Sequence, residues 1–140
     1  MIPKGFMILM ARVHVFLYRL TGGKIGGRMV GAPVMLLTST GRKTGKQRQM
    51  PLLFVTHPQG WVIAASSGGT PADPHWWINL KASPKTTIQI MGETHPVTAS
   101  EVKGKDYDKL WKQLVDLYAG YEEYAARTSR KIPVVLLKKG

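Results

Sequence analysis

Residues 38–51 read Thr38-Ser39-Thr40-Gly41-Arg42-Lys43-Thr44-Gly45-Lys46-Gln47-Arg48-Gln49-Met50-Pro51, and this stretch connects two short apolar runs. The flanking runs, Val34–Thr38 and Pro51–Thr56, have the length and composition of β-strands. A polar connection containing glycine between two such runs is typical of a β-hairpin. The stretch therefore predicts an antiparallel hairpin with a long tip.

The tip of this hairpin is cationic. Arg42, Lys43, Lys46 and Arg48 lie within seven residues, and no aspartate or glutamate precedes Asp73. The whole chain has 20 basic and 8 acidic residues, which gives a formal charge of +12. Because protein surfaces usually mix both signs, this imbalance indicates an anionic partner. Arginine and lysine in this density predict an anion clamp, with a merely solvated hairpin tip as the alternative.

The composition is that of one globular domain and fits a cytoplasmic protein. The chain has 140 residues and a hydrophobic fraction of 44%, enough to bury about two thirds of its unfolded surface. It has no cysteine, which excludes disulfides, thiolate catalysis and cysteine-ligated metal centres. The four histidines are scattered, so no metal site is expected.

The first 30 residues are predicted to form a helix and a glycine-rich connection, separate from a domain at 31–140. The apolar stretch Phe6–Leu20 is interrupted by Arg12, His14 and Arg19. It is shorter than the roughly 18 residues of a membrane-spanning helix, and no small-residue cleavage site follows it. Packing on the domain is the favoured interpretation. The alternative is a helix lying at the inner face of the cell membrane, with its arginines near lipid phosphates.

Further strand-like and helical segments follow the hairpin. The strand-like runs are Trp61–Ser66, Thr86–Ile90, Thr94–Val102 and Ile132–Leu137. The helical segments are Asp73–Ala82, Asp106–Leu117 and Ala119–Arg127. Closely spaced strands with hairpin connections predict a small antiparallel β-barrel with peripheral helices, a mainly β fold of the α+β kind.

A second group of candidate residues lies after the strand at 61–66. Ala64, Ala65, Ser66 and Ser67 are small, which lets a flat ligand approach the backbone closely. The serine hydroxyls are suited to bonding the carbonyls of a ring.

The next helix adds aromatic and amide groups. It is expected to open at Asp73 or Pro74, and it contains His75, Trp76, Trp77 and Asn79, the only asparagine in the chain. Adjacent helical residues diverge by about 100°, so both indoles cannot face one ligand. Core packing of this pair is therefore at least as well supported as ligand contact.

A third group consists of tyrosines. Tyr118, Tyr121 and Tyr124 are spaced by three residues, which places them on roughly one helical face. From the residues alone, core packing is the favoured interpretation. The alternative is a lid of phenols that stacks on a substrate and donates hydrogen bonds or protons.

These groups, in this order, resemble the deazaflavin-dependent nitroreductase family of mycobacteria and related actinobacteria. The likeness extends from Pro33 to Leu137, and its most specific pieces are Leu36–Gly45, Ala64–Ser66, Pro74–Pro84 and Arg127–Val134. The resemblance implies a split β-barrel that binds coenzyme F420, an 8-hydroxy-5-deazaflavin with a phosphate and an oligoglutamate tail. FMN or FAD is the alternative cofactor.

The resemblance also implies roles for individual residues. Arg42, Lys43, Thr44 and Arg48 would hold the phosphate and the tail. The rest of the cofactor would be lined by Gln49, Met50, Pro51, Leu52, Leu53, Ala64, Ala65, Ser66, Ser67, His75, Trp76, Trp77, Asn79 and Tyr121. Tyr118, Tyr121 and Tyr124 would cover the substrate, so the resemblance reverses the core-packing interpretation of the tyrosines. Ser66 would stabilise the developing oxyanion, and Tyr121 or solvent would deliver the proton.

The activity implied is hydride transfer from reduced coenzyme F420 to a flat, electron-poor quinone, activated enone or nitroaromatic. Leu53 stands where some nitro-reducing members have tyrosine, which argues against bulky nitroimidazoles as substrates; Ser67 and Trp77 also depart from those members. Two other classes remain open, a basic nucleic-acid-binding module and a non-catalytic carrier of a flavin or lipid. The known RNA- and DNA-binding motifs are missing, so no nucleic-acid partner is expected.

Overall fold

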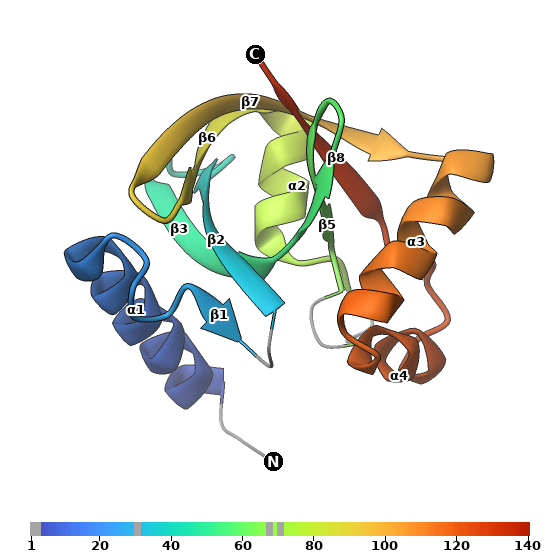
Figure 1. Cartoon of the computed structure of the whole chain (residues 1–140), viewed down its shortest axis with the longest axis horizontal. Coiled ribbons are helices and arrows are strands. Elements are labelled where there is room, and N and C mark those ends of the chain that lie inside the picture. Colours follow the sequence, from blue (N-terminus) through green and yellow to red (C-terminus); the bar gives the residue numbers. More distant parts are fainter. Residues whose placement is uncertain (1–3, 30–31, 67–68, 70–71) are drawn as a thin grey trace.

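The computed structural model describes residues 4–29, 32–66, 69 and 72–140. Within these residues the chain forms four helices and eight strands (Figure 1). In chain order they are α1 (Lys4–Thr21), β1 (Arg28–Met29), β2 (Ala32–Thr40), β3 (Gln47–Leu53), β4 (Val55–His57), β5 (Gly60–Ala64), α2 (His75–Ala82), β6 (Lys85–Ile90), β7 (Glu93–Val102), α3 (Lys105–Leu117), α4 (Gly120–Arg127) and β8 (Val134–Lys139).

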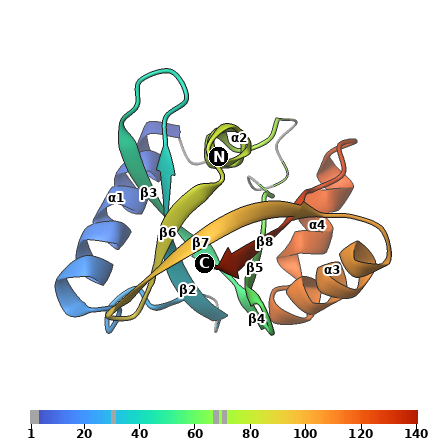
Figure 2. The same ribbon diagram turned by 90° about the horizontal axis from the view of Figure 1, so that it is seen from above.

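The predicted hairpin is confirmed. Strands β2 and β3 pair antiparallel over their length, from Val34 opposite Leu53 to Thr40 opposite Gln47. The tip is tight, because the Gly45 N–H donates to the Gly41 carbonyl at 2.8 Å and Gly45 has a φ of 71°, which glycine adopts without steric cost. The tip projects beyond the rest of the sheet, on the side where α2 lies (Figure 2).

The strands form a split antiparallel barrel, as predicted. Strand pairing follows the order β1-β2-β6-β7-β8-β5-β4, and β3 pairs with β2 off this path. Strand β3 continues into β4 through the buried Phe54. Because β3 pairs with β2 and β4 pairs with β5, this continuous segment connects the two ends of the sheet, which therefore curls round on itself. The strand expected over Pro51–Thr56 is therefore broken at Phe54, where the chain turns from one partner strand to another.

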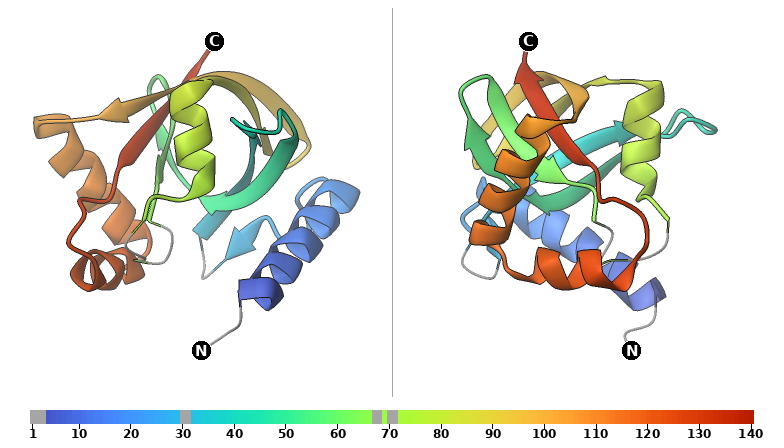
Figure 3. Two further views of the ribbon diagram at one scale, coloured as in Figure 1. Left: turned by 180° about the vertical axis from the view of Figure 1, so that it is seen from behind. Right: turned by 90° about the vertical axis from the view of Figure 1, so that its right-hand side faces the viewer.

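Helix α2 lies across the curled sheet (Figure 3). Alternate residues of the strands, including Met35, Leu37 and Ile63, point into one core cluster, as the period of two requires. Trp76, Trp77 and Leu80 of α2 belong to the same cluster. The helix thus contributes its apolar side to the barrel core.

Helices α3 and α4 cover a different part of the sheet (Figures 1 and 2). Leu110 and Leu114 of α3 are buried and pack with Val62 and Val134 of the strands, as an amphipathic helix requires. The Tyr107 hydroxyl donates to the Ile132 carbonyl at 2.7 Å. This bond fixes the segment that leads from α4 into β8.

Helix α1 packs on the barrel through its C-terminal half, which confirms the favoured interpretation of this segment. Tyr18 is fully buried, and its hydroxyl accepts a hydrogen bond from the Met91 N–H at 2.6 Å and donates to the Gln89 carbonyl at 3.3 Å. The His14 Nε2–H donates to the Gly26 carbonyl at 2.6 Å and ties down the glycine-rich connection.

The outward side of α1 is apolar and exposed. Its large exposed residues are Phe6, Ile8, Leu9, Met10, Val13, Phe16 and Leu20. In the part of the chain that the structure describes, no helix combines the length and apolar character needed to cross a membrane.

Candidate functional site

The cationic hairpin tip is attached to α2 through one buried amide. The Asn79 Oδ1 accepts hydrogen bonds from the Arg42 guanidinium at 2.9 Å and from the Arg42 backbone N–H at 3.3 Å. Asn79 is only 6% exposed, whereas Arg42 is exposed. Asn79 therefore orients a surface arginine, and its Oδ1 is directed at the tip.

The other cations of the tip lie at the surface. Lys43, Lys46 and Arg48 are exposed, as is Thr44. The ion pairs seen among the described residues involve Asp73, Glu93 and Asp116, and none includes a cation of the tip. The tip therefore presents concentrated positive charge that no carboxylate of the described chain neutralises, which suits a multiply charged anion.

Strand β3 leads from this charge into apolar surface. Gln49, Pro51, Leu52 and Leu53 are half-buried, and Met50 is 39% exposed. Among the described strands β3 pairs only with β2, so its other edge is not used in the sheet, and Pro51 is tolerated there because it has no N–H to donate. The strand thus offers a continuous polar-to-apolar surface.

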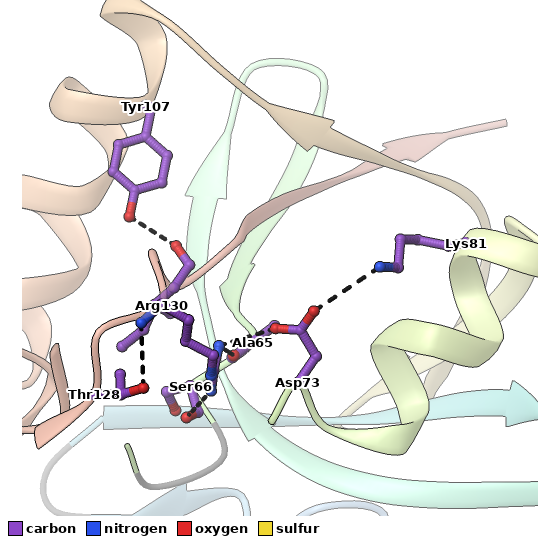
Figure 4. Close-up of polar contacts among 8 residues, drawn as sticks. Ala65, Ser66, Asp73, Lys81, Tyr107, Thr128 and Arg130 are labelled. Atoms are coloured by element: carbon purple, nitrogen blue, oxygen red, sulfur yellow. Dashed lines mark hydrogen bonds and ion pairs between the residues drawn. The ribbon is translucent and has the colours of Figure 1, made fainter. Parts of the chain in front are cut away.

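The end of β5 supplies the small residues. Ala64 and Ala65 are buried and Ser66 is half-buried, while Ser67 lies outside the described residues. Figure 4 shows the Arg130 side chain beside them: its guanidinium donates to the Ala65 carbonyl at 3.2 Å and to the Ser66 carbonyl at 2.7 Å. It also pairs with the Asp73 carboxylate at 3.0 Å.

Helix α2 links the two parts of the site. Asp73, immediately before α2, is held with the end of β5 by Arg130, and Asn79 within α2 holds the hairpin tip. His75 is exposed at the start of the helix. Trp76 and Trp77 are 6% and 3% exposed and pack in the barrel core, so a contact of either indole with a cofactor stays a prediction.

The three tyrosines gather on and beside α4, with their rings edge to face at 5.2 to 6.2 Å. The Tyr118 and Tyr124 hydroxyls are hydrogen-bonded at 3.0 Å. Tyr121 is 5% exposed and packs beside Trp111. The cluster has features of both predicted roles, core packing and a group of phenols.

The surroundings of Tyr121 and Tyr124 raise the pKa values of these two phenols. Burial, with smaller effects from the neighbouring Tyr124 and Tyr118, raises the pKa of Tyr121 well above its usual range. The hydrogen bond with Tyr118, together with burial, raises the pKa of Tyr124 to about 12. The Tyr121 and Tyr124 phenols are therefore weak acids that keep their protons at neutral pH.

The tyrosine helix lies against Gly69, beyond the end of β5. Gly69 has a φ of +79°, and a Cβ built on it would lie 2.7 Å from the Tyr124 carbonyl oxygen. The Gly69 N–H donates to the Ser66 carbonyl at 2.9 Å. Ser66 and the tyrosine helix are consequently both neighbours of Gly69.

The contacts of Arg130 could not be predicted from the sequence. The stretch Arg127–Val134 contributed to the family resemblance, but no function was assigned to any residue in it. Its partners lie 57 to 65 positions away in the chain, so no local pattern could reveal them.

These features fit a long ligand that is anionic at one end and planar at the other. The donor set of the tip suits phosphate and carboxylate groups, the unpaired edge of β3 suits an extended chain, and the small side chains at the end of β5 are compatible with the close approach of a ring. The fold and site define a split-barrel protein with a cationic clamp. A family described as F420H(2)-dependent quinone reductase matches residues 9–139, and the chain belongs to it.

Individual relatives agree with this assignment. The chain is similar to the F420H(2)-dependent quinone reductase Rv1261c of Mycobacterium tuberculosis strain H37Rv, with 40% identity over 136 residues, 94% of this chain and 91% of that protein. The solved structure of an F420-H2 dependent reductase, FDR-A, has a TM-score of 0.70 and 38% identity, covering 76% of this chain and 94% of that one. Another solved structure, described as a domain-swapped dimer, has a TM-score of 0.72 and 33% identity, covering 91% and 95%.

Proposed function

We propose that this protein reduces quinones with reduced coenzyme F420. Family membership supports the cofactor and the acceptor class. The observation from this chain that carries the proposal is the cationic tip, anchored on buried Asn79 and not paired with a carboxylate of the described residues. This arrangement provides binding energy for a phosphate and an oligoglutamate tail.

The protein contributes binding and orientation, since the cofactor, when bound, supplies the hydride. Arg42, Lys43 and Arg48 bind the anionic groups, with the Thr44 hydroxyl beside them. The unpaired edge of β3, residues 49–53, would support the extended part of the cofactor. Ala64–Ser66 would hold the ring, near the N-terminal end of α2.

The acceptor stacks under the tyrosine cluster. Ser66 donates a hydrogen bond to the quinone oxygen on which negative charge develops. Tyr121 keeps its proton, because burial raises its pKa, and steadies the substrate as a donor. One hydride and one proton convert the quinone to the hydroquinone, and the high pKa of Tyr121 favours solvent as the source of that proton.

Activated enones and nitroaromatics share the flat, electron-poor character of quinones, so they are candidate secondary acceptors. Leu53 is half-buried and packs both toward α1 and toward the cluster around α3 and α4, and it has no hydroxyl with which to orient a nitro group. We expect naphthoquinones to be reduced faster than enones, and bulky nitroimidazoles slowest.

An acceptor panel tests the reaction. Oxidation of reduced coenzyme F420 is followed with a short-chain naphthoquinone, cyclohexenone and a nitroimidazole, with and without protein. Protein-dependent oxidation that requires the quinone supports the proposal. Cofactor binding without turnover of any acceptor contradicts it and favours a non-catalytic carrier.

Helix α1 supports a second part of the proposal, binding to an anionic membrane surface. Phe6, Leu9, Val13, Phe16 and Leu20 are 49% to 70% exposed and recur at intervals of three and four residues, which places them on one stripe. Arg12 and Arg19 are exposed on the same helix, which has no acidic residue. A chain of charge +12 is repelled by a second copy and attracted by anionic lipid.

Vesicle flotation tests this part. The protein should float with phosphatidylglycerol vesicles and less with phosphatidylcholine, and Phe6→Ser with Phe16→Ser should abolish flotation. Met91→Ser is the matched control, because Met91 is 46% exposed on the β6–β7 turn. Failure of the wild-type protein to float, or conversion of a dimer to a monomer by the double variant, would contradict membrane binding.

A further inference from the structure

Arg130 joins three segments that are distant in sequence. Its guanidinium donates to the Ala65 and Ser66 carbonyls at 3.2 and 2.7 Å and pairs with the Asp73 carboxylate at 3.0 Å (Figure 4). Its own backbone N–H donates to the Thr128 hydroxyl at 3.3 Å. The end of β5, the start of α2 and the segment after α4 therefore meet at one side chain.

The surroundings of this side chain require an arginine. The side chain is 14% exposed and Asp73 is 29% exposed, so the charge pair is largely removed from solvent. Among the described residues, three acceptors lie around this one planar group, a geometry that the guanidinium fork satisfies and a lysine ammonium does not. Lys81 adds a weaker contact with Asp73 at 3.9 Å.

The contacts of Arg130 bracket the loop beside the tyrosine helix. The Ser66 carbonyl accepts both the Arg130 guanidinium at 2.7 Å and the Gly69 N–H at 2.9 Å. Gly69 in turn lies against the Tyr124 backbone. The position of Ser66 relative to the tyrosines thus depends on the carbonyl that Arg130 holds.

We propose that Arg130 is a positioning residue for hydride transfer: with Asp73 it fixes Ser66 against the tyrosine cluster. This inference rests on the proposed function, because it assigns Ser66 to the reacting end of the cofactor. The anionic end is held separately, by the tip that Asn79 anchors. Arg130 therefore governs turnover and leaves cofactor affinity nearly unchanged.

The test compares Arg130→Lys, Arg130→Gln and Asp73→Asn with the wild-type protein. Each variant is measured for cofactor affinity, for kcat and KM with a naphthoquinone, and for hydrogen exchange in the absence of cofactor. We expect kcat to fall about 10- to 100-fold, as for a reacting group misplaced by about 1 Å, and the cofactor Kd to change less than about threefold. The Gly69 amide should exchange faster, because its acceptor carbonyl is no longer fixed.

Lys131→Gln is the matched control. Lys131 follows Arg130, and its ammonium lies over the Tyr107 ring at 4.0 Å. This change therefore removes a cation from the same segment and leaves Arg130 and its hydrogen-bond partners in place. Its kcat and its Gly69 exchange should equal those of the wild-type protein.

Three results would overturn the inference: an unchanged kcat in Arg130→Gln, a parallel loss of kcat and cofactor affinity, or unaltered Gly69 exchange. Arg130→Lys keeps the charge, so its failure to restore turnover supports the requirement for a fork, whereas full restoration contradicts it. A wild-type protein that neither binds nor oxidises reduced coenzyme F420 would refute the proposed function instead, while hydrogen exchange would still report whether Arg130 orders the loop.

Discussion

Replacement of Asn79 by alanine should weaken cofactor binding without changing its dependence on salt. The substitution removes one oxygen that accepts from the Arg42 guanidinium at 2.9 Å and from its backbone N–H at 3.3 Å. Each bond contributes about 0.5–1.5 kcal/mol net, and Arg42 is exposed, so its freed donors are hydrated. With the space left by a buried side chain, we expect a stability loss of about 1–3 kcal/mol.

The effect on affinity follows from the freedom that Arg42 gains. A long side chain that must be ordered on binding costs about 0.5–1.5 kcal/mol, so the Kd for coenzyme F420 should rise about 2- to 12-fold. The number of cations in the clamp is unchanged in Asn79→Ala, so the ratio of Kd values at two salt concentrations should equal that of the wild-type protein. Arg42→Ala removes a charge and should reduce this ratio.

The assay is a fluorescence titration of oxidised coenzyme F420 at two salt concentrations, with both single variants and the double variant. Once Arg42 is alanine, Asn79 has no guanidinium to orient, so the two substitutions should not be additive. An unchanged Kd in Asn79→Ala, or full additivity in the double variant, would refute the role of Asn79 as the anchor of the clamp.

Three further predictions concern stability. Burial raises the pKa of Tyr18, Tyr107 and Tyr121, and the hydrogen bond with Tyr118 raises the pKa of Tyr124 to about 12. The unfolded phenols lose their protons near pH 10, whereas the folded ones lose them at higher pH. The urea midpoint should therefore be constant just below pH 10 and fall as the pH rises toward 12. Gly69→Ala should lower the free energy of unfolding by at least about 1–2 kcal/mol, the cost of a left-handed backbone with a Cβ, and should reduce turnover because the Tyr124 backbone must move; urea unfolding and kcat check both. Tyr18→Phe should cost about 1–2 kcal/mol through the hydroxyl hydrogen bonds and Tyr18→Ala about 3–5 kcal/mol through the cavity as well, and equal losses in denaturant titration would show that α1 does not dock through this ring.

The fold could be predicted from the sequence because its signals are local. The apolar runs beside the cationic tip have strand length, and the β2–β3 pairing between Val34 and Leu53 follows from them. The break at Phe54 could not be predicted, because residues 51–56 remain apolar or β-branched on both sides of it. The change of partner from β2 to β5 is decided by closure of the barrel, a property of the whole sheet.

The sequence supplies the candidate residues of the site, whereas their connections could not be predicted from it. A cluster of cations is visible in any sequence, but the bond from Arg42 to Asn79 joins residues 37 positions apart. The side-chain hydrogen bonds of Arg130 join residues that are farther apart in the sequence, and those of the Tyr18 hydroxyl span 71 and 73 positions. Such contacts depend on how the helices and strands pack, so the sequence offers candidate binding groups and the structure shows which residues contact and orient them.

The most direct test of the central claim is an anaerobic stoichiometric reaction between reduced coenzyme F420 and a naphthoquinone, with wild-type protein and with Arg42→Ala combined with Lys43→Ala. We predict one hydroquinone for each cofactor oxidised, a rate that requires the wild-type protein, and a cofactor KM that rises both with salt and in the double variant. No protein-dependent hydroquinone, or a double variant with the same KM as the wild-type protein, would contradict the assignment of this chain as a reductase that holds its cofactor by the cationic tip.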